Sequence, residues 1–257
     1  MATSTLSEGS TYTLTVNNVE DLAGNLIAPN TQAAFSFGSP PNQDLGLVGY
    51  WPLDEGTGTT TADVSGSGHL GTLVNGPVWT SDVALDFDGV DDYVDVGTLD
   101  VIGNAMTISA WFNAEDLANC GARDCRIVSK ATGVQEQDHY FMVSTIKSGS
   151  DTRLRFRLKT GTITTTLIAT SGILSENQWI HVAAVYDGST MRLYKDGAEV
   201  GTRNKTGTIA TDPTVSVWIG GNPSAATHRP WDGLIDDIRI YDRALTPQQI
   251  QTLATRP

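Results

Sequence analysis

Apolar and polar residues alternate in many short segments of the chain, and turn-forming residues separate these segments. Strict alternation places the apolar side chains on one face of a β-strand, and many closely spaced strands are typical of a β-sandwich or a β-barrel. The predicted strands of the main part of the chain are residues 47–53, 83–87, 93–97, 106–114, 125–130, 139–145, 153–159, 164–170, 179–187, 191–196, 198–204, 214–221 and 233–242. Asp187-Gly188 and Asp196-Gly197 predict tight hairpin turns, because this dipeptide tolerates positive φ angles. The pattern therefore predicts an all-β fold.

One segment near the C-terminus carries helix signals instead. Residues 246–254 (TPQQIQTLA) begin with Thr246, which is a good N-cap residue, and continue with Pro247 at the first helical position. We expect one short C-terminal helix there.

The first 38 residues form a separate pattern. Residues 11–16 and 33–37 alternate like two short strands joined by turn-forming residues. Two strands do not make an independent core in water, so this segment docks on the main domain, stays loose, or is the tail of a truncated module. Residues 39–45 contain two prolines and predict a linker, which places a domain boundary before Gly46.

Charge narrows the range of partners. The formal net charge is −13, whereas binding to nucleic acid or to an anionic membrane requires a basic surface. The acidity is compatible with a calcium site, because calcium prefers carboxylate and carbonyl oxygens, and equally with simple solubility. No apolar stretch reaches the ~18 residues that span a bilayer, so no membrane insertion is expected.

The two cysteines of the chain, Cys120 and Cys125, lie close together in the segment NCGARDC. A disulfide that closes this short loop would suit an oxidising compartment, and free thiols are the alternative. A zinc site would need more cysteine or histidine nearby.

Five motifs, which occur in order, resemble one known family. They are residues 46–79, 84–96 (ALDFDGVDDYVDV), 106–116 (MTISAWFNAED), 177–201 and 231–250 (WDGLIDDIRIYDRALTPQQI). They are similar to the signatures of the concanavalin A-like, laminin-G-like jelly-roll domains. The resemblance implies a two-sheet antiparallel jelly-roll sandwich over residues 46–257. It also implies binding of glycans or other extracellular ligands, often with calcium, by an accessory module.

A second resemblance concerns the N-terminal segment. Residues 12–25 (YTLTVNNVEDLAGN) and 33–37 (AAFSF) resemble the last two strands of bacterial immunoglobulin-like repeats in large surface and secreted proteins. The first ten residues lack the regions of a signal peptide, which leaves a cytosolic protein or a piece of a longer secreted chain. The resemblance favours the piece of a longer chain with an extracellular or cell-surface location.

The family resemblance further implies a structural calcium ion, held by a carboxylate on the closing strand and by backbone carbonyls. The matching carboxylate here is Asp236, and Asp63 is a second candidate ligand. A hydrogen bond or an ion pair, for example with Arg239, is the alternative role for Asp236.

Sugar binding uses exposed aromatic rings together with amide, carboxylate and arginine side chains. Trp218 alternates with Val217 and Ile219, so we expect its ring on the face that points away from the core. The loop that follows contributes three further candidates, His228, Arg229 and Trp231. Packing within the fold is the alternative role for both tryptophans.

A second group of candidate ligand-binding residues lies on neighbouring strands. His139 and Tyr140 follow a polar loop, and Arg155 and Arg157 alternate with three apolar residues in the segment RLRFRLK. Two arginines on the outward face could pair with an acidic or sulfated sugar. An ordinary solvated face is the alternative.

These features favour a non-catalytic, monomeric carbohydrate-binding module of a larger secreted or surface multidomain protein, which could itself be a glycoside hydrolase or a polysaccharide lyase. A protein-interaction or adhesion module is the alternative. A polysaccharide-cleaving enzyme ranks third, because the sequence contains no G-x-S-x-G nucleophile motif.

Overall fold

The computed structural model describes residues 10–16, 26, 31–37, 45–81, 84–117, 124–223 and 229–255. The chain divides into two compact units, Met1–Leu45 and Gly46–Pro257. The smaller unit contains one antiparallel pair of strands, β1 (Ser10–Val16) and β2 (Thr31–Phe37). These two strands agree with the alternating pattern of the sequence. The resemblance to an immunoglobulin-like repeat stays a prediction, and most of the predicted linker lies outside the described residues.

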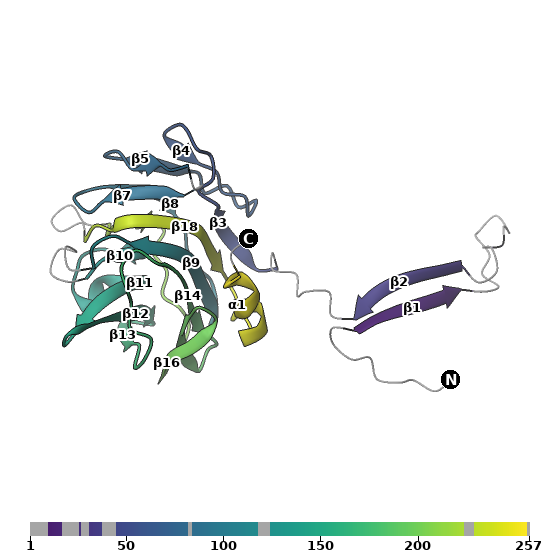
Figure 1. Ribbon diagram of the computed structural model, residues 1–257. Coiled ribbons are helices and arrows are strands. Elements are labelled where there is room, and N and C mark those ends of the chain that lie inside the picture. The colour runs from purple at the N-terminus through teal and green to yellow at the C-terminus, as the bar shows by residue number, and fades with distance from the viewer. Residues whose placement is uncertain are drawn as a thin grey trace. The chain divides into compact units, whose positions relative to one another are not determined.

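The larger unit is a sandwich of two antiparallel sheets, drawn in Figure 1 from dark blue to yellow. The first sheet contains, in spatial order, β13 (Ile163–Ile168), β12 (Asp151–Thr160), β11 (His139–Ser148), β10 (Arg126–Ala131), β17 (Ser216–Ile219), β8 (Tyr93–Thr98), β5 (Gly71–Val74) and β4 (Thr60–Thr61). A single turn of 3₁₀ helix, η1 (Glu136–Asp138), precedes β11.

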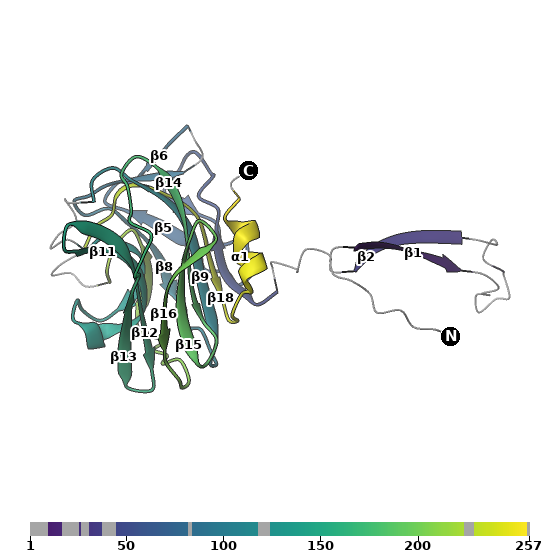
Figure 2. The same cartoon turned by 60° about the horizontal axis from the view of Figure 1, so that its bottom comes forward.

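The second sheet faces the first across the core (Figure 2). It contains, in spatial order, β16 (Ala198–Asn204), β15 (Thr190–Lys195), β14 (Trp179–Tyr186), β9 (Met106–Ala114), β18 (Asp232–Tyr241), β7 (Leu85–Asp88) and β6 (Val78–Trp79), and β3 (Leu47–Trp51) also pairs with β18. The two sheets confirm the predicted all-β jelly-roll sandwich.

The core lies between the inner faces of the two sheets. Phe141, Phe156 and Val217 come from the first sheet, Phe112 and Ile240 come from the second, and each is at most 1% exposed. Because side chains alternate across a strand, the residues between these core positions point away from the core. This alternation creates the polar outer face of the first sheet.

The outer face of the second sheet is covered by the helix α1 (Pro247–Leu253), shown in yellow in Figure 1. Thr246 is its N-cap residue and accepts a hydrogen bond from the backbone N–H of Gln249, as the sequence predicted. Ile250 and Leu253 pack on apolar side chains of β14, β15 and β18. The outer face of the first sheet carries no α-helix among the described residues, and η1 packs on its β13 edge through Gln137 and Thr164.

The alternating pattern missed three short strands, β4, β5 and β6. They lie in the glycine-, threonine- and serine-rich part of the chain between residues 54 and 81, where no alternation is visible. Their pairing with neighbours distant in the sequence, for example Leu73 opposite Val94, holds them in the sheets. Tertiary contacts rather than local propensity therefore define these strands.

Candidate functional site

A row of side chains crosses the outer face of the first sheet from an aromatic pair to an arginine. The strand registers place Trp218 of β17 opposite Ser129 of β10, Ser129 opposite Met142 of β11, and Met142 opposite Arg157 of β12. Arg157 in turn lies opposite Thr166 of β13. Residues in register on adjacent strands share one face of the sheet, so these side chains form one continuous row. Trp218 and Arg157 at its two ends are half-buried, whereas Ser129 and Met142 between them are 0% exposed.

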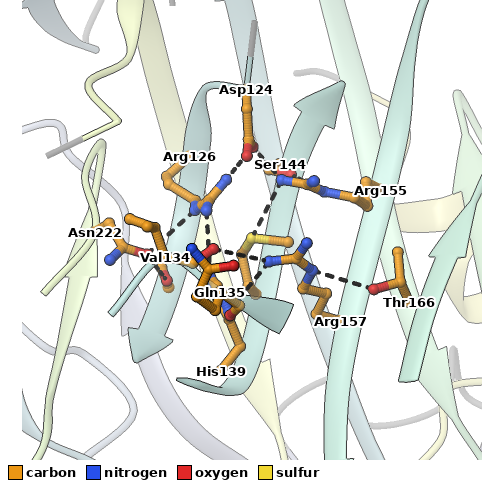
Figure 3. A network of polar contacts seen from close by, with 12 residues as sticks. Asp124, Arg126, Val134, Gln135, His139, Ser144, Arg155, Arg157, Thr166 and Asn222 are labelled. Atoms are coloured by element: carbon orange, nitrogen blue, oxygen red, sulfur yellow. Dashed lines mark hydrogen bonds and ion pairs between the residues drawn. The ribbon is translucent and has the colours of Figure 1, made fainter. Parts of the chain in front are cut away.

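Next to this row, two arginines share one carboxylate. Arg126 Nη1 and Arg155 Nη2 both donate to Asp124 Oδ1, and Figure 3 shows the two guanidinium groups converging on it. Arg126 is 0% exposed and Arg155 is 4% exposed. Burial opposes ionisation of Asp124, but the charges of Arg126 and Arg155 outweigh it and hold the pKa of Asp124 below its ordinary value.

The arginine cluster, defined as Asp124, Arg126, His139, Arg155 and Arg157, also contains a neutral histidine (Figure 3). His139 Nδ1 lies 2.7 Å from the carbonyl oxygen of Gln135, so this nitrogen carries the proton and donates it. The other ring nitrogen, Nε2, then accepts a hydrogen bond of 3.2 Å from Arg126 Nη2. Burial and the charges of Arg126 and Arg157 lower the pKa of His139 to about 3, so the ring stays uncharged at neutral pH.

The loop before β11 holds the third arginine of the cluster. Arg157 Nε donates to Thr166 Oγ1 at 3.1 Å, and Arg157 Nη1 lies 3.4 Å from the carbonyl oxygen of Val134. The side chain of Gln137 pairs with the backbone of Thr164, which fixes the loop against β13. Arg157 remains half-buried at the rim of the cluster.

One amide connects the arginine cluster with the aromatic end of the row. Asn222 Oδ1 accepts hydrogen bonds from Arg126 Nε at 3.2 Å and from Ser129 Oγ at 3.1 Å. Beside Ser129, the half-buried ring of Trp218 stacks on Tyr93, with 3.6 Å between the ring centroids and 15° between the planes. The site therefore offers an aromatic pair, neutral polar groups and cations on one face.

Of the candidates in the loop after β17, two are described and one lies outside the described residues. Arg229 is half-buried, and its positive charge contributes to the low pKa of Asp124, so it lies near the arginine cluster. Its carbonyl oxygen accepts from the backbone N–H of Arg126 at 3.1 Å. His228 lies outside the described residues.

Trp231 requires a correction. Its side chain is 0% exposed and packs edge to face on Phe112, with 5.2 Å between the ring centroids. A ring enclosed by the core offers no face to a ligand, so the expected ligand contact of Trp231 is wrong and its alternative role, packing, holds. Arg155 differs in a smaller way, because it lies on the predicted face but is buried by its contacts with Asp124, Ser144 and Met142.

Tyr140 lies among a different set of partners. Its hydroxyl donates to Asp212 Oδ2 at 2.8 Å, and the ammonium groups of Lys130 and Lys159 lie 5.8 and 5.0 Å from its ring centroid. Burial and the Asp212 carboxylate raise the pKa of Tyr140 to about 12. These contacts separate Tyr140 from the arginine cluster, although His139 precedes it directly in the sequence.

Neither predicted calcium ligand, Asp63 or Asp236, belongs to a group of three clustered carboxylates among the described residues. Asp63 accepts hydrogen bonds from the backbone N–H groups of Tyr50, Ser65 and His69 at 2.9 to 3.0 Å, which gives it a structural role in the turn. Asp236 lies half-buried on β18, and the ion pair with Arg239 is made by Asp237. The calcium site stays a prediction.

Three other carboxylates do lie close together. Among the described residues, Asp88, Asp91 and Asp92 form the one group of three whose oxygens lie within 4.8 Å of one another. Asp88 accepts from the backbone of Val90, and Asp92 accepts from the backbone of Asp88. Oxygen ligands of this type suit calcium better than a softer metal.

The disulfide also stays a prediction. Cys125 is 1% exposed, and Cys120 lies outside the described residues.

Two arrangements that could suggest catalysis have structural roles. Ser109 Oγ and His181 Nε2 lie 2.8 Å apart, but the two residues are 1% and 0% exposed, so a substrate cannot reach them. Glu136 and Asp138 have the Glu-x-Asp spacing of some glycosidases but lie on η1 rather than on a strand. Glu136 accepts from Thr166, and Asp138 accepts from the backbone of Gln135.

Comparison with known proteins assigns the family. Residues 88–251, more than half of the chain, match the laminin G-like family model described as the concanavalin A-like lectin/glucanases superfamily. The chain belongs to the concanavalin A-like superfamily. This assignment confirms the resemblance that the five motifs carried.

Relatives of this concanavalin A-like chain include parts of much longer proteins. Adhesion G-protein coupled receptor V1 of Danio rerio is 24% identical over 226 residues, which are 87% of this chain and 3% of the receptor. Mouse pappalysin-1 is 29% identical over 161 residues, which are 59% of this chain and 10% of that protein. The chain therefore spans a small part of the curated relatives that it matches.

Solved structures share the fold of this concanavalin A-like chain at low sequence identity. Domain 4 of AbnA, an extracellular GH43 arabinanase from Geobacillus stearothermophilus solved with arabinotriose, matches with a TM-score of 0.57 and 21% identity. That match covers 81% of this chain and 98% of the domain. The ligand binding domain of botulinum neurotoxin serotype D, solved with N-acetylneuraminic acid, matches with a TM-score of 0.57 and 13% identity over 82% of this chain and 51% of that one.

Sequence reasoning missed Tyr93, Asp124, Arg126 and Asn222. An arginine next to the apolar residues Ile127 and Val128, two positions after an aspartate, was the available signal for Arg126 and Asp124. Asn222 carried no comparable signal, because its partners Arg126 and Ser129 lie more than 90 residues away in the sequence.

Proposed function

We propose that this chain is a non-catalytic carbohydrate-binding module of a larger extracellular protein. The observation that carries the proposal is the half-buried Trp218–Tyr93 stack and the half-buried Arg157 on the same outer face of the first sheet, joined by a row of side chains in register. Aromatic rings contact the apolar faces of sugars, and amides, hydroxyls and guanidinium groups bond to their hydroxyls. Two structural neighbours were solved in complex with sugars, which agrees with a carbohydrate ligand.

Binding without cleavage is supported by the state of the groups in the site. His139 is the histidine of the arginine cluster, and both its ring nitrogens are engaged, by Gln135 and Arg126. A histidine with a pKa of about 3 is a poor general base near neutral pH, because the optimum lies close to the working pH. Asp124 is likewise engaged by two arginines.

The test is retention of the full chain by immobilised polysaccharides in affinity electrophoresis, with a range of neutral and acidic plant and marine polymers. We expect retention by at least one polymer, and we expect Trp218→Ala to weaken it by about tenfold or more, since stacking on one ring contributes about 1–3 kcal/mol. Trp179→Ala is the matched control, because Trp179 is a half-buried tryptophan of the second sheet. Retention by none of the polymers would refute the proposal.

A second candidate function is adhesion through a protein partner. The observation that favours it is the similarity to an adhesion receptor over 87% of this chain. A pull-down from extracellular extracts that recovers one specific protein, together with no retention by any polysaccharide, would select this function. Release of reducing ends or unsaturated sugars by the purified chain would instead show catalysis.

A further inference from the structure

The arginine cluster contains more positive charge than its own carboxylates neutralise. Three arginines belong to it, Arg126, Arg155 and Arg157, and Asp124 is the one carboxylate that bonds to them in the part of the chain that the structure describes. The bonds of Arg157 go to a hydroxyl and a carbonyl. Glu136 and Asp138 lie close enough to offset part of the charge of Arg157, but they bond to Thr166 and to the backbone of Gln135. The surplus of cations is therefore one of direct ion pairs.

Three arginines elsewhere in the same molecule each have a carboxylate partner that they share with no other arginine. Arg153 bonds to Asp151 at 3.1 Å, Arg192 to Asp187 at 2.5 Å, and Arg239 to Asp237 at 2.7 Å. The chain as a whole has a net charge of −13, so carboxylates are not scarce. The arginine cluster differs from these pairs, because two of its arginines share one carboxylate and the third bonds to none.

The positive charges of the arginines repel one another, and this repulsion lowers their pKa values. Burial lowers the pKa of Arg126, and the charges of Arg155 and Arg157 lower it further, while Asp124 partly offsets both. Burial and the charge of Arg155 likewise lower the pKa of Arg157. A negative group placed beside these side chains would remove the repulsion, and such charge-assisted hydrogen bonds are among the strong ones in proteins.

Donor groups for an incoming anion are present. Within the described residues, Arg155 uses Nε and Nη2 for Ser144, Asp124 and Met142, which leaves Nη1 without a partner. Arg157 uses Nε and Nη1, which leaves Nη2 without a partner. Both arginines lie on β12 two residues apart, so their side chains project from the same face.

We propose that the arginine cluster binds the anionic group, a carboxylate or a sulfate, of an acidic polysaccharide. The proposal rests on the proposed carbohydrate-binding function and names the substrate class of that site. The planar guanidinium of Arg157 can donate two parallel hydrogen bonds to such a group. Trp218 lies three strand positions away on the same face, about 14 Å at the usual strand spacing, so one oligosaccharide can reach both ends.

The test compares polymers that differ only in charge. Polygalacturonate is compared with its fully methyl-esterified form, and dextran sulfate with dextran, by titration of the full chain in calorimetry at 50 and 300 mM salt. We expect the acidic member of at least one pair to bind about tenfold tighter or more than its neutral partner, with an advantage that shrinks at high salt. The first pair tests a carboxylate, and the second tests a sulfate.

Substitutions in the arginine cluster test whether the preference for acidic polymers depends on this cluster. Arg157→Gln should lower the affinity for the acidic polymer about tenfold and that for the neutral polymer by a clearly smaller factor, because only the acidic polymer loses a charge-assisted hydrogen bond. Arg157→Lys keeps the charge but loses the planar fork, and should give an intermediate loss. Arg192→Gln is the matched control, because Arg192 lies on β15 of the second sheet. Thermal unfolding verifies that each variant folds, and Arg155→Gln replaces Arg157→Gln if that variant does not.

The outcomes separate this inference from the proposed function. Equal binding of acidic and neutral polymers overturns the inference and leaves the carbohydrate-binding function intact. An equal loss of acidic binding in Arg157→Gln and Arg192→Gln also overturns it, since binding would then follow overall charge. No binding of any polymer overturns the proposed function itself.

Discussion

The environment of Asp92 disfavours the ionised form of its carboxyl group. Its side chain is 3% exposed and lies beside Asp88 and Asp91. Burial raises the pKa of Asp92 to about 6, and the neighbouring carboxylates add to this effect against one hydrogen bond from the backbone of Asp88. The folded protein therefore binds a proton at Asp92 more tightly than the unfolded chain does.

The pH dependence of stability follows from this pKa. Because the folded-state pKa lies above the ordinary value of 3.8, Asp92 costs stability as the pH rises from about 4 through 6. Asp92→Asn cannot ionise, so we expect it to raise the free energy of unfolding by about 2 kcal/mol at pH 7.5 and hardly at all at pH 4. Thermal unfolding in the presence of EDTA measures both values.

EDTA is needed for Asp92→Asn because a bound cation would stabilise the ionised carboxylates and reverse the expected sign. Asp54→Asn, at an exposed carboxylate, is the control and should change little at either pH. A stability gain of the same size at both pH values would contradict the assigned environment of Asp92.

At the scale of the elements, the end of β17 connects three strands through Gly220. The Gly220 N–H donates to the carbonyl oxygen of Ile127 at 2.9 Å, and its own carbonyl accepts from Trp231 at 2.8 Å. Gly220 has a φ of +76°, and a Cβ atom there would lie 2.3 Å from Cε1 of Phe87. No residue with a side chain fits this position without movement of the core.

We expect Gly220→Ala to lower the free energy of unfolding by about 3 kcal/mol, because left-handed backbone strain and an overpacked core add together. Gly58→Ala separates the two causes, since Gly58 has a φ of +93° but a Cβ atom there would meet no other atom within 4 Å. That variant should lose only about 1 kcal/mol. Chemical denaturation of the two variants provides the comparison, and equal losses would exclude the steric contribution of Phe87.

On the scale of the whole molecule, the division into two units is the main feature. All members of the large core cluster lie between Trp51 and Ile240, and the second cluster, under α1, uses residues from Leu47 to Leu253. Among the described residues, no member of either cluster comes from the Met1–Leu45 unit. The described members of both clusters come from residues of the larger unit. None of the helices that the structure describes is long and apolar enough to cross a membrane.

A fragment of residues 46–257 should fold without the N-terminal unit. We expect its unfolding midpoint to lie within about 2 °C of that of the full chain, because both core clusters are built from residues of the larger unit. Differential scanning calorimetry of both proteins tests this. A midpoint more than about 5 °C lower would mean that the N-terminal strands stabilise the sandwich.

The amino-acid sequence alone determined the class of the fold. The alternation in RLRFRLK and in VSVWI fixed which side chains face the core, since Leu154, Phe156, Leu158, Val217 and Ile219 are all 0% exposed. Thr246 and Pro247 likewise fixed the start of the helix. Both features are local. Side chains alternate from residue to residue along a strand, and a helix start depends on the residue types at its first positions, so both can be read from the sequence.

The composition of the candidate site was decided only by the tertiary structure. Alternation predicted that Arg155 and Arg157 lie on the outer face. It did not predict that Asp124 bonds to both Arg155 and Arg126. It also did not predict that Asn222 bonds to both Arg126 and Ser129. It also failed for Trp231, whose ring fills the core beside Phe112 although the sequence suggested a binding loop. Partners in this site lie as far apart in the sequence as Tyr93 and Trp218, and the strand order that brings them together is set by the packing of the two sheets. Local pattern cannot specify contacts of that range, because they exist only once both sheets have closed over one core.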